Sequence, residues 1–263
     1  MYLTDYHTHT KLSPDGSVPL AEMAEDAVAA GLNELWNTGH WDLLGVYGEP
    51  LGHYNWPPAL EQYAAVAPRY AGKLTIRLGL EFGMAHLNPE ASRAILDRPE
   101  LDFVLGSIHN LCPQKGGTDF YYVDYPDPAA CYAALDDYFA SMAQLAVTDF
   151  YDVLSHIIYP LRYMDHPISL DRYHDVLDGI FRAAAERGRG IEINTWRGRT
   201  LKEWLPVLKQ FKARGGEIVT IGSDAHTTDG VGKGCEQACQ LLAEAGFRYL
   251  ATYEKRKPVF HTL

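Results

Sequence analysis

The chain has 263 residues, a hydrophobic fraction of 47% and a formal net charge of −11. This length and apolar content suit one large α/β domain, which we expect to span residues 1–263. The acidic balance argues against nucleic acid as a partner, because binding to a phosphate backbone requires a basic surface. No apolar run is long enough to span a membrane. The N-terminal MYLTDYHTHT lacks the basic start and apolar core of a signal peptide, which favours a cytoplasmic location.

Strand-like and helix-like patterns alternate along the chain. Pro19 and Gly31 mark the start and the end of the first predicted helix. Long loops over Leu43–Pro58 and Leu111–Asp127 interrupt the alternation, and we expect the first to act as a lid. Strands are predicted over Tyr2–Tyr6, Glu34–Thr38, Leu74–Leu80, Phe103–Ile108, Tyr151–Ser155, Gly190–Ile193 and Glu217–Ile221, with a short final strand over Phe247–Thr252. Helices are predicted over Leu20–Ala30, Ala59–Tyr70, Pro89–Asp97, Pro128–Val147, Leu170–Arg187, Leu201–Arg214 and Gly234–Ala245.

Seven β–α units without a break in composition predict an α/β fold with a parallel sheet. The polar residues that follow the strands come from every part of the chain, and we expect them to meet at one point. A closed or nearly closed (β/α)7 barrel of the TIM type brings strand ends together in this way. An open doubly wound sheet would instead spread them along a line.

Metal-binding residue types follow most of the predicted strands. His7 and His9 are two residues apart on extended backbone, so both side chains point to the same side, and Asp224 and His226 repeat this spacing. Glu81 could bridge two ions through its two oxygens. The full set of nine candidate ligands is His7, His9, Asp15, His40, Glu81, His109, His156, Asp224 and His226. A purely structural role for all nine would bury several ionisable groups together without a cation, which is costly, so the set predicts a polynuclear metal site.

The remaining histidines lack this position after a strand, and we expect them not to bind metal: His53, His86, His166, His174 and His261. The four cysteines form no CxxC pair, which argues against a thiolate zinc site and favours free thiols. They are Cys112, Cys131, Cys235 and Cys239.

The order of these motifs resembles the PHP (polymerase and histidinol phosphatase) superfamily, and within it the stand-alone L-histidinol-phosphate phosphatases. The motifs are HTH at His7, Asp15, GH at His40, GLEFG at Glu81, GSIHN at His109, LSH at His156 and SDAH at Asp224. The resemblance implies a distorted (β/α)7 barrel with a site for up to three metal ions (zinc, iron or manganese) at the C-terminal ends of the strands. It implies one ion on His7, His9, Glu81 and Asp224, a second on Glu81, His109 and His156, and a third on Asp15, His40 and His226.

One residue departs from the family pattern. The family often has Asp before the second-strand histidine, whereas this chain has Gly39 before His40. The departure removes a carboxylate that would contact a ligand rather than a ligand itself.

The activity implied by the resemblance is hydrolysis of a phosphate monoester, L-histidinol phosphate, in histidine biosynthesis. Arg162 in YPLRY and Arg197 in EINTWR are expected to grip the phosphate, because a guanidinium binds phosphate bidentately. Arg199 is the alternative to Arg197. Asn194 is a possible hydrogen-bond donor to the phosphate, and Asp224 or His226 could assist proton transfer to the leaving alkoxide. The candidate walls of an imidazole pocket are Trp41, Tyr47, Tyr54 and Trp196.

Two other functions fit the same motifs. The first is a PHP phosphoesterase acting on a sugar phosphate, a nucleotide, a phosphotyrosine protein or a nucleic-acid 3′ end, of which the last conflicts with the negative charge. The second is a catalytically silent PHP module that binds a partner, and the nearly complete ligand set argues against it. Phosphate release from a panel of monoesters distinguishes the three.

Overall fold

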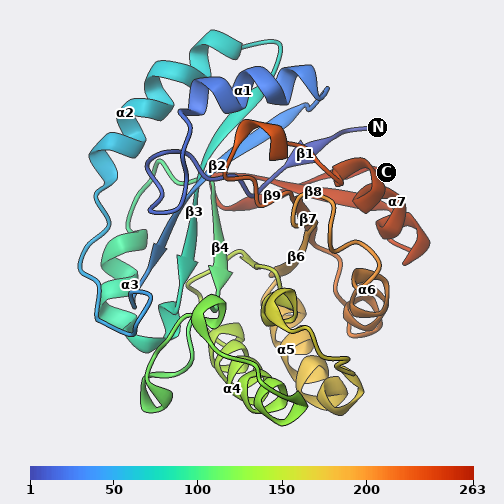
Figure 1. Ribbon diagram of the computed structural model, residues 1–263. Helices are drawn as coiled ribbons and strands as arrows, with labels where there is room; N and C mark the ends of the chain where they lie inside the picture. The colour runs from blue at the N-terminus through green and yellow to red at the C-terminus, as the bar shows by residue number, and fades with distance from the viewer.

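Seven parallel strands form the central sheet of the protein, for which a computed structural model describes residues 1–263. The strands lie side by side in chain order, with helices around them (Figure 1). The strands are β1 Thr4–Asp5, β2 Glu34–Asp42, β3 Thr75–Gly83, β4 Phe103–Ser107, β5 Val153–Leu154, β6 Gly190–Asn194 and β7 Val219–Gly222. The helices are α1 Leu20–Ala29, α2 Trp56–Val66, α3 Pro89–Leu96, α4 Pro128–Ala146, α5 His174–Glu186, α6 Trp204–Ala213 and α7 Cys235–Glu244.

The sheet closes on itself between β1 and β7. The Tyr6 amide donates to the Ile221 carbonyl at 2.8 Å, and beyond the strands Thr8 and Ala225 form a parallel bridge. Because hydrogen bonds therefore join the first and last strands, the seven strands make a nearly closed barrel, as predicted. Its largest apolar cluster packs β3–β7 against α3–α7 and includes Phe139, Phe181 and Phe211.

Local sequence accounts for the helix boundaries. The apolar face of α1 consists of Leu20, Met23, Ala24 and Ala27, a spacing that aligns them on one side of a helix. The Asp127 carboxylate accepts from the Ala130 amide at 2.8 Å and begins α4. α3 begins in the same way, because the Asn88 side chain accepts from the Ala91 amide at 3.1 Å. No helix is long and apolar enough to cross a bilayer. All four cysteines are free thiols, as predicted.

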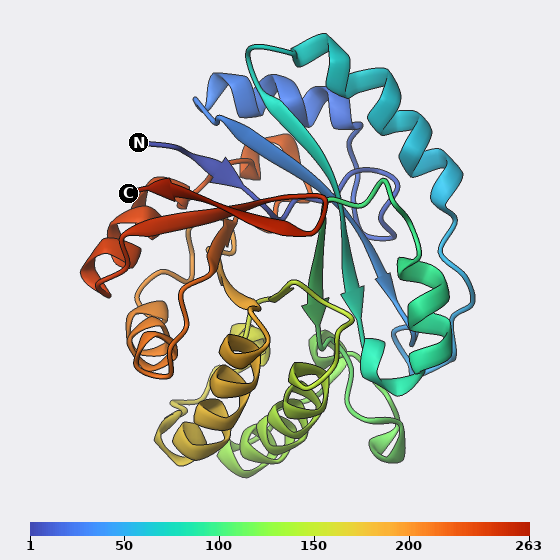
Figure 2. The same cartoon turned by 180° about the vertical axis from the view of Figure 1, so that it is seen from behind.

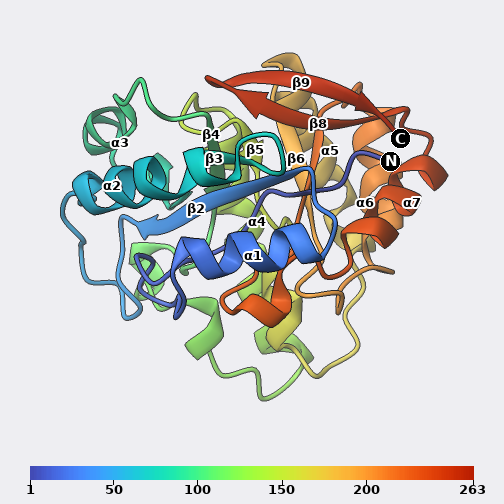
Figure 3. The same cartoon turned by 90° about the horizontal axis from the view of Figure 1, so that it is seen from above.

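An antiparallel hairpin covers the N-terminal end of the barrel. It consists of β8 Tyr249–Glu254 and β9 Lys257–Thr262 and lies across the strands in Figure 2 and at the top of Figure 3. The Tyr253 amide donates to the Tyr6 hydroxyl at 2.7 Å. Arg256 pairs with the fully buried Asp152 just before β5. The hairpin therefore seals the end of the barrel away from the predicted ligands.

Several predicted boundaries shift. β2 and β3 run four and three residues past their predicted ends, so that His40 and Glu81 are paired neighbours within the two strands. α2 begins at Trp56 rather than Ala59, with two prolines in its first turn. It gives way to a 3₁₀ turn, Ala67–Tyr70, where Pro68 has no amide hydrogen to donate.

Two further helices begin later than predicted, and the C-terminal strand is longer. A separate 3₁₀ turn, Asp171–Tyr173, precedes α5, and α6 begins at Trp204. The predicted final strand, Phe247–Thr252, is β8, shifted by two residues, and its partner β9 was not predicted.

Candidate metal centre and active-site cavity

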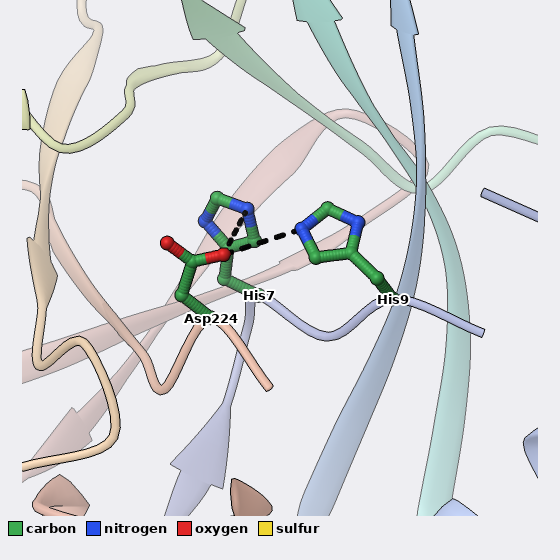
Figure 4. A group of neighbouring side chains, drawn as sticks. All are labelled: His7, His9 and Asp224. Atoms are coloured by element: carbon green, nitrogen blue, oxygen red, sulfur yellow. Dashed lines mark ion pairs between the residues drawn. The ribbon is translucent and has the colours of Figure 1, made fainter. Parts of the chain in front are cut away.

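Four ligand-type atoms from three strands surround one point at the C-terminal end of the barrel. Thr8 pairs with Ala225 in a parallel bridge. His7 and His9 flank Thr8, and Asp224 precedes Ala225, so that the two histidines and the aspartate face each other (Figure 4). His7 Nε2 lies 3.1 Å from Glu81 Oε2 and 3.6 Å from Asp224 Oδ1. His9 Nε2 lies 3.4 Å from each of the same two oxygens. Ligands of a tetrahedral zinc ion lie about 3.3 Å apart, and these four separations are close to that value.

A second cluster uses the other oxygen of Glu81. Its Oε1 atom lies 2.9 Å from His156 Nε2 and 3.1 Å from His109 Nε2, and the two imidazole nitrogens are 3.1 Å apart. Because Glu81 directs one oxygen to each cluster, its carboxylate is placed as the predicted bridge.

The third predicted cluster lies nearer the solvent. Asp15 Oδ2 is 2.9 Å from His226 Nε2 and 3.3 Å from His40 Nδ1. The His226 ring packs against the His9 ring with centroids 4.4 Å apart, which joins this cluster to the first. All nine predicted ligands are therefore together at one end of the barrel. The five other histidines belong to no such group.

The chemistry of these residues fits divalent metal ions. The His7 Nε2 atom, which faces Glu81 and Asp224, is buried without a hydrogen-bond partner. Burial disfavours a charged His7 ring, but the nearby carboxylates, led by Glu81, raise its pKa well above the usual value. Burial lowers the pKa of His156 to about 4, which keeps its ring neutral as a ligand must be. Burial also opposes ionisation of Glu81, yet the imidazoles around it hold its pKa well below the usual range.

Two carboxylates that sequence reasoning missed orient the ligand histidines. Glu192 Oε1 lies 2.8 Å from His7 Nδ1, and its Oε2 accepts from the His156 amide at 3.0 Å. Asp42 Oδ2 lies 3.0 Å from His40 Nε2, and Asp42 Oδ1 lies 3.1 Å from His109 Nδ1. A carboxylate on the second nitrogen fixes the ring and the tautomer of a ligand histidine. Asp42 could have been found from the sequence, because it follows His40 by two residues on one extended strand.

Glycines leave room for these carboxylates. A Cβ atom at Gly83 would lie 1.3 Å from Asp42 Oδ1, and one at Gly222 would lie 2.3 Å from Glu192 Oε1. At the residue that departs from the family pattern, a Cβ on Gly39 would lie 2.5 Å from the Tyr54 hydroxyl. The position where the family often has a carboxylate is thus filled by a tyrosine, and Asp42 supplies a carboxylate from two residues beyond His40.

Replacing Asp42 by Asn is expected to lower the affinity for the ions held by His40 and His109 by about 10- to 100-fold. The amide offers one oxygen and one NH2 group, so one of the two imidazole N–H groups loses its acceptor. Metal content after equilibrium dialysis measures the effect. Asp97→Asn, an exposed carboxylate after α3, is the control, and equal metal content in the two variants would contradict this role.

Arg162 lies deep in the cavity and is held by two predicted site residues. Its Nη1 donates to Asp224 Oδ2 and its Nη2 to Asn194 Oδ1, both at 2.7 Å, and its side chain is 5% exposed. Asn194 is fully buried and lies behind the arginine rather than in the cavity wall. The structure thus places Asn194 to orient Arg162 and not at the phosphate-facing surface.

Arg197 lines the cavity and forms no ion pair. Its Nε atom is buried without a hydrogen-bond partner, whereas Arg199 lies outside the cavity wall over the Trp196 ring. Trp196, Arg197 and Asp224 have φ angles of 44°, 57° and 60°. Left-handed backbone costs roughly 1–3 kcal/mol at such residues and is concentrated at functional sites.

The clusters and arginines open into a cavity of about 460 Å³. Trp41 and Trp196 line it, as predicted for aromatic walls, whereas Tyr47 and Tyr54 do not. Residues 44–46 and Leu51 of the first long loop form part of its wall. The predicted lid therefore lies beside the cavity, and its movement stays a prediction.

Known proteins resemble this chain over nearly its whole length. A family model for the PHP domain matches residues 5–196. The chain belongs to the PHP domain family. This PHP chain is 30% identical to a Clostridium acetobutylicum protein named a probable histidinol-phosphatase, with 96% of the chain and 97% of the relative covered. It is 26% identical to the histidinol-phosphatase of Lactococcus lactis, over 96% of the chain and 95% of the relative.

Two solved structures share the fold of this PHP chain. The crystal structure of histidinol phosphate phosphatase from Lactococcus lactis, in complex with zinc, L-histidinol and phosphate, superposes with a TM-score of 0.83 at 26% identity and 98% coverage of both chains. A Listeria monocytogenes protein of known structure gives a TM-score of 0.75 at 17% identity, covering 90% of this chain and 100% of that one, which shows a shared fold. The predicted PHP family and the predicted barrel are confirmed.

Proposed function

We propose that this PHP protein is a metal-dependent phosphatase that hydrolyses L-histidinol phosphate to L-histidinol and phosphate, a step of histidine biosynthesis in the cytoplasm. The observation that carries the proposal is the meeting of three ligand clusters and two arginines at one cavity. The Lactococcus lactis enzyme, similar over nearly its full length, was solved with zinc, L-histidinol and phosphate. A small phosphate monoester is therefore the partner we assign.

The nine predicted ligands are proposed to hold two or three divalent ions of zinc, iron or manganese. One set is His7, His9, Glu81 and Asp224, another is Glu81, His109 and His156, and the third is Asp15, His40 and His226. When bound, such ions activate water and neutralise the phosphoryl oxygens. Mixed imidazole and carboxylate ligands suit several first-row metals, so donor type alone does not choose one.

The protein's own groups position the phosphate. Arg197 offers a guanidinium without an ion-pair partner at the cavity wall, and we assign it to the phosphoryl oxygens. Arg162 is held by Asp224 and Asn194, so its planar group is already oriented and loses little freedom when it binds phosphate. The proton for the leaving alkoxide is assigned to the segment with Asp224 and His226, since both side chains line the cavity.

Phosphate release from a panel of monoesters tests the proposal. L-histidinol phosphate is expected to show a higher kcat/KM than p-nitrophenyl phosphate, a fructose phosphate or a nucleoside monophosphate. A better sugar or nucleotide substrate would overturn the histidinol assignment and leave a PHP phosphoesterase of another specificity. Absence of hydrolysis with every monoester, in protein loaded with metal, would favour the partner-binding module.

Arg197→Ala is expected to lower kcat/KM for every phosphate substrate to the same extent, by about 2–4 kcal/mol of transition-state stabilisation. The reason is that the guanidinium contacts only the phosphoryl end. Comparison of kcat/KM for L-histidinol phosphate and p-nitrophenyl phosphate measures this effect. Arg199→Ala is the matched control and should leave kcat/KM unchanged for both substrates. Trp41→Ala, in the cavity wall, should instead shift the preference between substrates. A loss confined to one substrate in Arg197→Ala would contradict its assignment to the phosphate.

A further inference from the structure

One carboxylate in the cavity wall has no basic partner. Five acidic residues line the cavity, and four of them have an oxygen within 3.0 Å of an imidazole or guanidinium nitrogen: Asp15, Asp42, Glu81 and Asp224. The fifth, Asp119, forms no ion pair with any residue of the chain. Every acidic group of the cavity except this one therefore has a basic partner.

Asp119 is held in place by the loop that carries it. Its Oδ1 atom accepts from the Tyr121 amide at 2.7 Å and from the Tyr159 hydroxyl at 3.5 Å, and no group of the protein donates to its Oδ2 atom. Its backbone pairs with that of Asn110 beyond the end of β4. A fixed carboxylate with one oxygen free of donors is prepared to accept a hydrogen bond from a ligand.

The surroundings of Asp119 suit a cation. Tyr121, Tyr159 and Tyr163 all line the cavity, and the Tyr163 ring packs edge-on against the other two with centroids 5.3 Å apart in each case. Aromatic faces next to a carboxylate stabilise positively charged nitrogen groups. Burial raises the pKa of Asp119 by more than the nearby His109 lowers it, so its charge is only partly compensated in the free protein. A bound cation would supply that compensation.

The cavity therefore holds a free carboxylate as well as the arginines. Tyr159 contacts both kinds of group, since the Arg162 guanidinium is 5.2 Å from the centre of its ring and Asp119 accepts from its hydroxyl. The arginines and ligand clusters suit the phosphate of a substrate. Asp119 suits a group that carries positive charge away from the phosphate.

We propose that Asp119 is a specificity-determining residue that binds a cationic nitrogen of the substrate. The inference rests on the proposed function, because L-histidinol phosphate carries both an ammonium group and an imidazole. A monoester without a cationic nitrogen gains nothing from Asp119. The residue therefore sets the preference among monoesters, which the arginines cannot do.

Asp119→Asn tests the proposal, because the Asn oxygen still accepts from the Tyr121 amide while the negative charge is lost. The ratio of kcat/KM for L-histidinol phosphate to that for p-nitrophenyl phosphate is expected to fall about 10- to 100-fold, mainly through KM. Calorimetric binding of L-histidinol should weaken by a similar factor, and binding of inorganic phosphate should stay unchanged. Asp127→Asn is the matched control, since Asp127 also accepts from a nearby amide but lies outside the cavity.

An unchanged ratio, or an equal loss with both substrates, would overturn the role of Asp119 while leaving the phosphatase in place. Failure of the wild-type enzyme to hydrolyse L-histidinol phosphate would instead overturn the proposed function. Aminoethyl phosphate and imidazolylpropyl phosphate each carry one of the two nitrogen groups. Sensitivity of either to Asp119→Asn supports the proposal and identifies the nitrogen, and insensitivity of both overturns it.

Discussion

Treatment of the purified protein with a strong chelator is expected to abolish phosphatase activity. Nine imidazole and carboxylate groups meet at one end of the barrel, many of them about 3 Å apart, and phosphate ester hydrolysis is among the slowest uncatalysed reactions in water. Without the ions, the remaining arginines cannot supply the missing stabilisation. Metal analysis by mass spectrometry, run together with phosphate release, measures both quantities on one sample.

Re-addition of zinc, manganese or iron should restore the activity. The ion that restores the most activity is the best cofactor. Untreated enzyme should contain two or three ions per chain. Fully active enzyme with less than one ion per chain would rule out metal dependence.

His156→Ala and His109→Ala should each lower kcat by more than about 100-fold, since residues that merely orient a metal ligand already cost 10- to 100-fold. Both nitrogens lie about 3 Å from Glu81 Oε1 in the second cluster. Each variant should also lose metal while its far-UV circular dichroism spectrum stays that of the folded barrel.

His174→Ala is the control for these variants. Its side chain is 59% exposed and its one ion pair is with the neighbouring Asp175. The change should leave both metal content and turnover at wild-type values. If His174→Ala lowered metal content and turnover as much as His109→Ala, a position at the end of a strand would not identify the metal ligands.

The sequence was most informative where metal-binding residue types recur at the two-residue spacing of extended backbone. The HxH spacing identified His7 and His9 because extended backbone directs alternate side chains to one face. The barrel followed from the need for ligands of distant sequence position to meet. Asp224 reaches the same site from left-handed backbone with a φ angle of 60°, so the argument from extended backbone does not hold for the DxH motif.

The missed features are those that only tertiary contact reveals. Glu192 occupies an ordinary inward position of a strand, and its role is evident only from the His7 nitrogen 2.8 Å away. Asp42 looked like the start of a loop because β2 was expected to end earlier. The turn of the C-terminal hairpin places Lys255 and Arg256 in left-handed backbone without the Asn-Gly or Asp-Gly pair that usually announces such a turn.

Closure of the barrel has a consequence for the order of events during synthesis. The bridge between Thr8 and Ala225 joins the two ends of the strand series, and the ligands His9 and Asp224 each donate a backbone amide across this seam at 2.8 Å. The first metal shell therefore exists only after the chain has been made through its seventh strand and that strand has docked. A ribosome-bound chain that ends before Asp224 has the histidines but no shell. With the proposed ligands, metal uptake would thus follow completion of the barrel and would stabilise the joined seam.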